Sequence, residues 1–302
     1  MIWLIKHLFR NREAMRSPER YAAYLREFAA DPDLIRLKRS AQQAGAYPEG
    51  PDNSWRYDFT RLPVHDALLK AYKLDEIAGQ GTVFERSLRI MDWLCAHTYY
   101  SGMNLLSGLL FSRSLFKGTW ANSLRVLRFA YDRPFRRSLN CGHKAVILAD
   151  CLMAAGIAAM PLTFMNYIYR PEEEKAEHMP NHTAVHVWLP KERRWVMLDP
   201  SMNSYVADNV GRALDLVEIQ RRHRQGEELR VAQYHLNGTQ DFREEYLDSF
   251  VLGCLLDIVV CDGSSRIGGF HRNRLLPEDV PPKDDKARAI TTAELLAEPK
   301  LI

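Results

Sequence analysis

Apolar and polar positions along the chain follow two periods, a helical one in the first half and a strict alternation further on. The helical period predicts helices at residues 17–45, 82–97, 119–133 and 141–154, and a shorter one near residues 214–224. Two of them carry start signals. Ser17 precedes Pro18, which suits an N-cap followed by proline at the first helical position. Thr82 and Glu85 have the spacing of a capping box.

Alternation begins after residue 156 and predicts strands. Residues 157–165 form an apolar run, and residues 182–189 and 193–199 are two further strand candidates joined by a short turn. Helices that precede a short antiparallel sheet indicate the α+β class. We expect an N-terminal helical region at residues 1–80, a core at 81–230 and a C-terminal extension at 231–302 that packs on the core. The composition of residues 275–289 predicts a mobile tail in that extension.

Composition excludes several classes of protein. The 302 residues are 46% hydrophobic and 26% charged, with a net charge of +3, so nothing in the charge indicates nucleic-acid binding. Lys6 and His7 interrupt the apolar N-terminus too early for a signal peptide, and a short amphipathic helix is expected there. No run approaches the roughly 18 apolar residues of a membrane span. Five cysteines without CxxC spacing indicate a reduced, cytoplasmic protein.

Cys141 stands at the predicted start of a helix whose apolar stripe comes afterwards. The sequence places it in the first turn, off the stripe, and Gly156 is suited to end the helix. A helix N-terminus stabilises a thiolate, which is the reactive form of cysteine, and its free N–H groups can donate to an oxyanion. The alternative is that Cys141 is a small, partly buried apolar residue, as most cysteines are.

Two histidines follow on a predicted strand. Alternation puts His182 and His186 on one strand face, which could be a solvent-exposed face or part of a site. A turn at residues 189–192, with Pro190 at its second position, places His182 opposite Asp199. A histidine facing a carboxylate is the arrangement of a base and the group that orients it. A slip of four residues would place His186 opposite Asp199 instead, but it would put Pro190 in the ladder.

A metal site is a rival interpretation of the histidines. On a strand, His182 and His186 lie about 13 Å apart, and no CxxC or HExxH spacing supports zinc. We therefore expect neither a metal nor another cofactor. The remaining cysteines lie in apolar settings and are expected in the core; they are Cys95, Cys151, Cys254 and Cys261.

Three segments together resemble a known family. "LNCGHKAVILADCLMAAGIAA", "NHTAVHVW" and "RRWVMLDPSMNSYV" are similar to the transglutaminase-like superfamily of Cys-His-Asp enzymes, and "GTWANSLRVLRFAYDRPFRRSLNCGH" resembles its bacterial members. The resemblance covers roughly residues 88–229. It implies a papain-like core in which the cysteine helix packs on an antiparallel sheet. It also implies Cys141 as nucleophile, His182 as general base and acid, and Asp199 as the residue that orients the imidazole.

This chain departs from the family at two places. His186 stands where relatives usually have Glu, which would change the charge beside the site and tune substrate preference. The segment "HTYYSGMN" matches the family only loosely, so His97 is expected to be structural. Further candidates for contacting substrate or supporting the triad are Asn140, Gly142, His186, Trp120 and Asn203. For Trp120 and the nearby Asn122, a core and a capping role are equally open.

The expected function is acyl transfer or hydrolysis at an amide or thioester carbonyl through an acyl-enzyme. The substrate would be a peptide, an amide or an acyl thioester, free or carried on a protein. Water as acceptor gives a peptidase or amidase, and an amine gives a transamidase, which includes amide formation from a carrier-protein thioester. A non-catalytic peptide-binding module of the same fold is the competing class. The motifs leave the substrate, the acceptor and the oligomeric state open.

Overall fold

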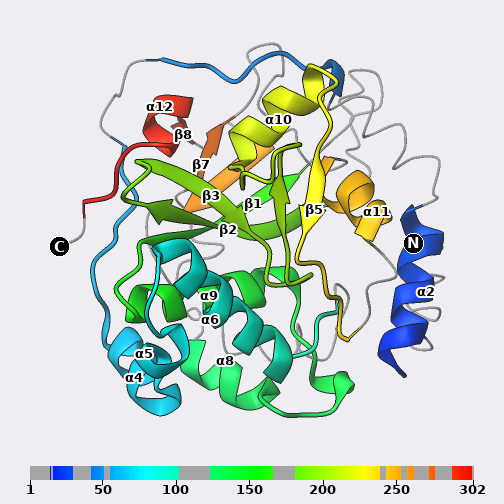
Figure 1. The fold of residues 1–302 in the computed structure, drawn as a ribbon, viewed down its shortest axis with the longest axis vertical. Helices are drawn as coiled ribbons and strands as arrows, with labels where there is room; N and C mark the ends of the chain where they lie inside the picture. Colours follow the sequence, from blue (N-terminus) through cyan, green and yellow to red (C-terminus); the bar gives the residue numbers. More distant parts are fainter. Residues whose placement is uncertain are drawn as a thin grey trace.

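The computed structural model describes residues 14, 16–29, 42–50, 55–101, 123–165, 181–238, 243–252, 257–261, 272–275 and 288–300. This part of the chain combines a helical layer with a mainly antiparallel sheet, so the prediction of the α+β class is confirmed (Figure 1). The N-terminal segment 1–13 and most of the expected tail, residues 276–287, lie outside the described residues. No helix in the described part is long and apolar enough to cross a membrane.

The helices gather mainly on one side of the sheet. Helices α4, α6 and α8 pack on α9, and α9 packs on strands β1 and β2 (Figure 1). The helical elements are α2 (Pro18–Ala29), α4 (Pro63–Tyr72), α5 (Leu74–Ala78), α6 (Val83–His97), α8 (Ser123–Ala130), η1 (Phe135–Arg137), α9 (Cys141–Ala154), α10 (Leu216–Arg224), α11 (Arg243–Tyr246), the π-helix η2 (Leu247–Leu252) and α12 (Thr292–Leu295).

The start signals in the sequence mark the helix boundaries correctly. Helix α2 begins at Pro18. Thr82 caps α6 by accepting a hydrogen bond from the Glu85 N–H at 3.2 Å, and the Glu85 side chain accepts one from the Thr82 N–H at 2.8 Å. These reciprocal bonds satisfy donors that every helix leaves unpaired at its N-terminus, which is why a short local motif suffices to fix the boundary.

Among the described residues, the main sheet has six strands in the order β3-β2-β1-β6-β7-β8, and a second sheet pairs β4 with β5. All neighbours are antiparallel except β7 and β8. The strands are β1 (Ala159–Met165), β2 (Asn181–Leu189), β3 (Arg194–Leu198), β4 (Tyr205–Ala207), β5 (Arg230–Ala232), β6 (Asp257–Cys261), β7 (Arg272–Leu275) and β8 (Arg288–Ala289). Strand β6, from the segment expected as a C-terminal extension, pairs directly with β1.

Both faces of β2 are buried, so the polar row of this strand is no solvent face. Val185, Val187 and Leu189 pack with α9 in one hydrophobic cluster. The opposite face, with Ala184 and Trp188, belongs to a second cluster on the other side of the sheet. His182 and His186 lie on this second face and are completely buried. A strand buried on both faces needs a specific partner for each polar side chain that it carries.

The register of β2 and β3 differs from the sequence prediction by two residues. Trp188 pairs with Trp195, where the prediction paired it with Arg193. The connection spans residues 190–193, and Arg193 has a positive φ of 49° that lets the longer turn close. Because side chains alternate with a period of two, a shift by two residues leaves every side chain on its predicted face. His182 and Asp199 therefore still share one face.

A buried polar cluster fixes the helical layer far along α9 from Cys141. His65 of α4 accepts the Leu62 N–H on Nδ1 at 3.1 Å, and its Nε2 lies 3.3 Å from Asp150 Oδ1. Ser123, the first residue of α8, donates to Asp150 Oδ2 at 2.5 Å. All three side chains are buried. The carboxylate of Asp150 thus ties three helices together.

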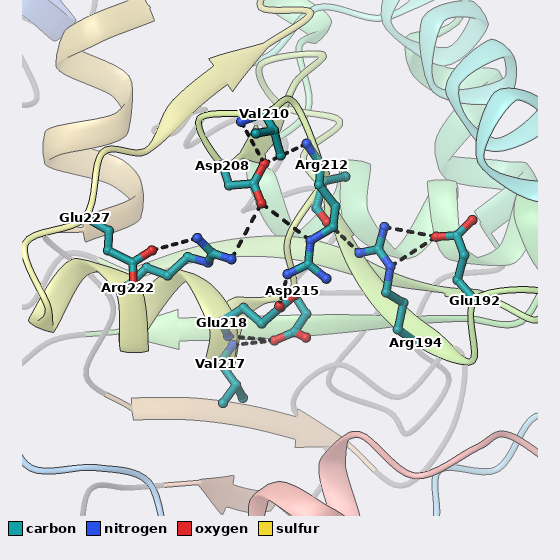
Figure 2. A network of polar contacts seen from close by, with 11 residues as sticks. Glu192, Arg194, Asp208, Val210, Arg212, Asp215, Val217, Glu218, Arg222 and Glu227 are labelled. Carbon is teal, nitrogen blue, oxygen red and sulfur yellow. Dashed lines mark hydrogen bonds and ion pairs between the residues drawn. The ribbon is translucent and has the colours of Figure 1, made fainter.

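A network of ion pairs holds α10 against the loops beside it (Figure 2). Asp215 caps the helix, with Oδ1 accepting the Val217 and Glu218 N–H groups at 2.8 and 2.9 Å. Three ion pairs join α10 to the loops before and after it: Arg212–Glu218 at 2.5 Å, Arg222–Asp208 at 3.5 Å and Arg222–Glu227 at 2.6 Å. A fourth pair, Arg194–Glu192 at 2.9 Å, lies at the turn between β2 and β3. Burial raises the pKa of Asp215 to about 7.

We predict that Asp215→Asn removes a pH dependence of stability. The pKa of Asp215 is about 7 in the folded chain and near the ordinary 3.8 when unfolded, so the folded state binds more protons between these values. The stabilising contribution of this carboxyl group therefore falls as the pH rises from about 4 to about 7, by about 1 kcal/mol or more. Asparagine keeps the cap. Urea unfolding across pH should show that the free energy of unfolding of the variant increases relative to that of the parent over this range. A constant difference between the two would contradict the raised pKa of Asp215.

Candidate active site

Cys141 is the first residue of α9, as the sequence predicts. Asn140 is the N-cap, and its Oδ1 accepts the His143 N–H at 2.8 Å. The N–H groups of Cys141 and Gly142 belong to the first turn, where an α-helix leaves its backbone donors without intrahelical acceptors. The helix differs from the prediction of a single apolar stripe, because every residue from His143 to Ala154 is buried. Only the first turn reaches the edge of the packed layer, and there Cys141 remains partly exposed.

Gly142 lies between the cap and the strand that carries the histidines. A Cβ atom on it would stand 3.5 Å from Asn140 Oδ1 and 4.0 Å from Thr183 Oγ1, which is ordinary contact. Steric space therefore does not require glycine here. The same distances show that the start of α9 and the beginning of β2 meet at this point.

His182 and Asp199 are brought together as predicted. His182 Nε2 lies 2.5 Å from Asp199 Oδ2, and both side chains have no exposed surface. The imidazole also contacts Phe164, its neighbour across β1 and β2, with ring centroids 5.5 Å apart and nearly perpendicular planes. Because Nε2 is engaged by Asp199, Nδ1 is the nitrogen left to exchange a proton with Cys141, whose pKa His182 lowers.

Asp199 ends β3 and begins a tight turn. Its backbone N–H and C=O both bond to Ser204, at 2.8 and 3.1 Å, and Asn203 adopts a positive φ of 48° to close the turn. The carboxylate accepts two further hydrogen bonds: the Ser201 N–H donates to Oδ1 at 2.8 Å, and the Tyr246 hydroxyl donates to Oδ2 at 2.6 Å. A fully buried carboxylate with this many donors has a defined position and charge state.

The pKa values of the pair move apart. Burial alone would lower the pKa of His182, but the charge and hydrogen bond of Asp199 raise it to about 10. Burial alone would raise the pKa of Asp199, but the charge of His182 and the hydrogen bonds from His182, Tyr246 and Ser201 hold it below the ordinary value. The site thus favours an imidazolium beside a carboxylate at neutral pH.

The Cys141 thiol is shifted toward its thiolate. Burial raises its pKa, but the hydrogen bond and charge of His182 and a hydrogen bond with Thr183 outweigh burial and lower the pKa below the ordinary value. The Thr183 hydroxyl lies 3.2 Å from the Thr163 hydroxyl across the β1–β2 ladder. The two other thiols that the structure describes behave differently, since burial raises the pKa of both Cys95 and Cys151.

His186 is held away from this network. Its Nε2 accepts the Leu216 N–H at 3.1 Å at the start of α10, and its ring stacks on Trp195 at 6.1 Å between centroids. Burial without a carboxylate partner lowers the pKa of His186 to about 3, so it is neutral. In this geometry His186 supports α10 and adds no charge beside Cys141.

The other candidates are spread around the site. Asn203 Nδ2 donates to Asp92 Oδ1 of α6 at 2.8 Å. It lines a cavity of about 390 Å³ together with Asp92, Cys95, Ala96, Gln233, Tyr234, His235 and Arg243. His97 stacks on Tyr131 and bonds Asp132 at 2.7 Å, as a structural residue would. Trp120, Asn122 and Cys254 lie outside the described residues.

Three residues of the site had no role in the sequence analysis. Tyr246 lies far along the chain in an apolar stretch, and no local pattern connects it to Asp199. Thr183 alternates with Val185 and Val187 on the apolar face of β2, a pattern that predicts packing. Tyr100 is buried close to Cys141 and Asp199, and its N–H and C=O bond the Asn237 side chain at 2.6 and 2.8 Å. Only the position of Thr183 directly after His182 could have pointed to its role.

No group of three or more metal-binding side chains lies together within the described ranges. Comparisons with models of protein families, with curated proteins and with solved structures find no match. Function is therefore inferred from the geometry of the site.

We predict that the Thr183 hydroxyl contributes to the reactivity of Cys141. Thr183→Val keeps the shape of the side chain but removes the donor, which should raise the pKa of Cys141 and slow its alkylation by iodoacetamide at neutral pH by about threefold to tenfold. Thr183→Ser retains the hydroxyl and is the matched control. Equal rates in the Val and Ser variants would show that the hydroxyl does not act on the thiol.

Proposed function

We propose that this protein is a cysteine-dependent enzyme that transfers or hydrolyses an acyl group at an amide or thioester carbonyl through an acyl-enzyme. Cys141 is the nucleophile, His182 is the general base and acid, and Asp199 orients and charges the imidazole. We further propose that α9 and strands β1–β3 form a papain-like core of the transglutaminase-like kind.

The observation that carries the proposal is the buried His182–Asp199 pair, together with its electrostatic coupling to the Cys141 thiol at the start of α9. The contact within the pair, at 2.5 Å, joins two side chains without exposed surface, while the thiol remains partly exposed at a helix start. A buried ion pair is costly to maintain unless its geometry is good. A thiol with a lowered pKa next to an imidazole with a raised pKa is the combination that nucleophilic catalysis requires.

The first half-reaction follows from this arrangement. The Cys141 thiolate attacks the carbonyl carbon, and the N–H groups of Cys141 and Gly142 donate to the oxyanion that forms. The C–N or C–S bond then breaks, and the imidazolium of His182 gives its Nδ1 proton to the leaving amine or thiol. The product is a thioester on Cys141 and a neutral His182.

The second half-reaction returns the enzyme to its starting state. Water or an amine approaches the thioester, His182 takes a proton from it, and the new C–O or C–N bond replaces the C–S bond. Water gives a hydrolase and an amine gives a transferase, and both use the same three residues. A non-catalytic peptide-binding module would gain nothing from a thiolate–imidazolium pair, so the charges at this site favour an enzyme.

Trapping the acyl-enzyme tests the proposal. The parent chain is incubated with a panel of acyl thioesters and peptide amides, and the intact protein and its peptides are weighed. We expect an adduct on Cys141 that is absent from Cys141→Ala and strongly reduced in His182→Ala. The proposal fails if iodoacetamide at neutral pH labels Cys95 or Cys151 as fast as Cys141, because the thiol would then not be activated.

We predict that Asp199→Asn weakens the ion pair between the Cys141 thiolate and the His182 imidazolium by changing the pKa of both groups. Without the carboxylate charge, burial lowers the pKa of His182 and the pKa of the Cys141 thiol rises. The acid limb of iodoacetamide inactivation should move to higher pH, and the rate near neutral pH should fall by about tenfold or more. Iodoacetate is an anion that the imidazolium attracts, so it should alkylate Cys141 faster than iodoacetamide does while His182 is charged. This difference in rate should disappear near pH 10 in the parent, where His182 loses its proton, and at lower pH in the variant. Unchanged limbs would remove Asp199 from the triad.

A further inference from the structure

We propose that Tyr246 is a positioning residue of the active site, which holds Asp199 in its ionised form and in line with His182. This inference rests on the proposed function. It makes α11 of the C-terminal segment part of the apparatus that activates Cys141, with Tyr246 acting through the carboxylate of Asp199.

The contacts of Tyr246 support a direct action on the carboxylate. Its hydroxyl donates to Asp199 Oδ2 at 2.6 Å, which is the oxygen that also binds His182 Nε2. Its ring has no exposed surface and meets the imidazole edge at 6.4 Å between centroids. Burial and the charge of Asp199 raise the pKa of Tyr246 far above the ordinary value, so the hydroxyl keeps its proton and remains a donor at every physiological pH.

A buried ion pair needs such a donor. An imidazolium and a carboxylate in an apolar interior can relax to a neutral imidazole and a neutral carboxylic acid, and the charged form wins only where other hydrogen bonds stabilise it. Ser201 supplies one such bond, to Oδ1. On Oδ2, Tyr246 is the neutral donor beside His182. Its loss should shift the pair toward the neutral form, and the thiolate should then lose its imidazolium partner.

The groups facing the pair come from several elements. Cys141 of α9, Cys95 of α6, Tyr100 and Tyr246 all interact electrostatically with Asp199. The buried ammonium of Lys144 lies beside Cys95 and donates to the Thr98 carbonyl at 3.2 Å. Tyr246→Phe leaves the side chains of Cys141, Cys95, Tyr100 and Lys144 in the chain, so a shift in the pH profile reports on the Tyr246 hydroxyl.

The experiment compares Tyr246→Phe with a matched control in the full-length chain. Tyr234 is equally buried and its ring packs on Tyr246 at 5.6 Å between centroids, but its hydroxyl lies 3.9 Å from Met202 Sδ. Tyr234→Phe therefore removes a hydroxyl from the same cluster and leaves the hydrogen bond from Tyr246 to Asp199 in place. For each variant, the rate of Cys141 alkylation by iodoacetamide is measured across pH, and unfolding by urea reports stability.

We expect Tyr246→Phe to move the acid limb to higher pH and to reduce the alkylation rate near neutral pH by about tenfold. The control should keep the parent profile at comparable stability. In an Asp199→Ala background, Tyr246→Phe should have no additional effect, because it acts through that carboxylate.

Equal profiles for the two Phe variants would overturn the inference, and so would a shift of the acid limb to lower pH, which would mean that the hydroxyl only competes with His182. Slow alkylation of Cys141 in the parent itself would instead refute the proposed function. The two failures are therefore distinguishable.

Discussion

The structure around the candidate site depends on one buried charge, the carboxylate of Asp199. A carboxylate without exposed surface is tolerable only if its oxygens accept strong hydrogen bonds. The donors come from three parts of the chain: His182 on β2, Ser201 in the turn after β3, and Tyr246 on α11. Satisfying this single group fixes the place of a strand, a turn and a C-terminal helix relative to one another.

Two histidines on one strand face show how partners decide charge. His182 and His186 are four residues apart and both fully buried. Beside Asp199, the pKa of His182 rises to about 10, whereas His186, which accepts a backbone N–H from α10, has a pKa lowered to about 3. Desolvation acts on both rings alike. The charge and hydrogen bond of Asp199 are the largest of the contributions that raise the pKa of His182, and His186 has no such partner in the described part of the chain.

In helix α9, the buried part and the partly exposed thiol lie at different positions along the helix. Beyond its first turn it is buried on all sides, by the sheet and by helices α4, α6 and α8. This gives a rigid support, and the buried Asp150 cluster fixes the helix far from Cys141. The thiol stands at the one end where backbone donors remain and where β2 brings His182 and Thr183 to the same point.

Local features of the sequence determined the α+β class, the helix starts at Pro18, Val83 and Cys141, and the shared strand face of His182 and Asp199. Capping and alternation are short-range, so a few neighbouring residues encode them. The exact register was not encoded in this way: it depended on the left-handed conformation of Arg193 and was shifted by two residues. The pairing of β6 with β1 and the contact of Tyr246 with Asp199 could not be predicted from the sequence, because contacts between distant segments leave no local pattern. Only the tertiary packing determined that the Tyr246 hydroxyl would be the donor that completes the hydrogen bonds of the Asp199 carboxylate.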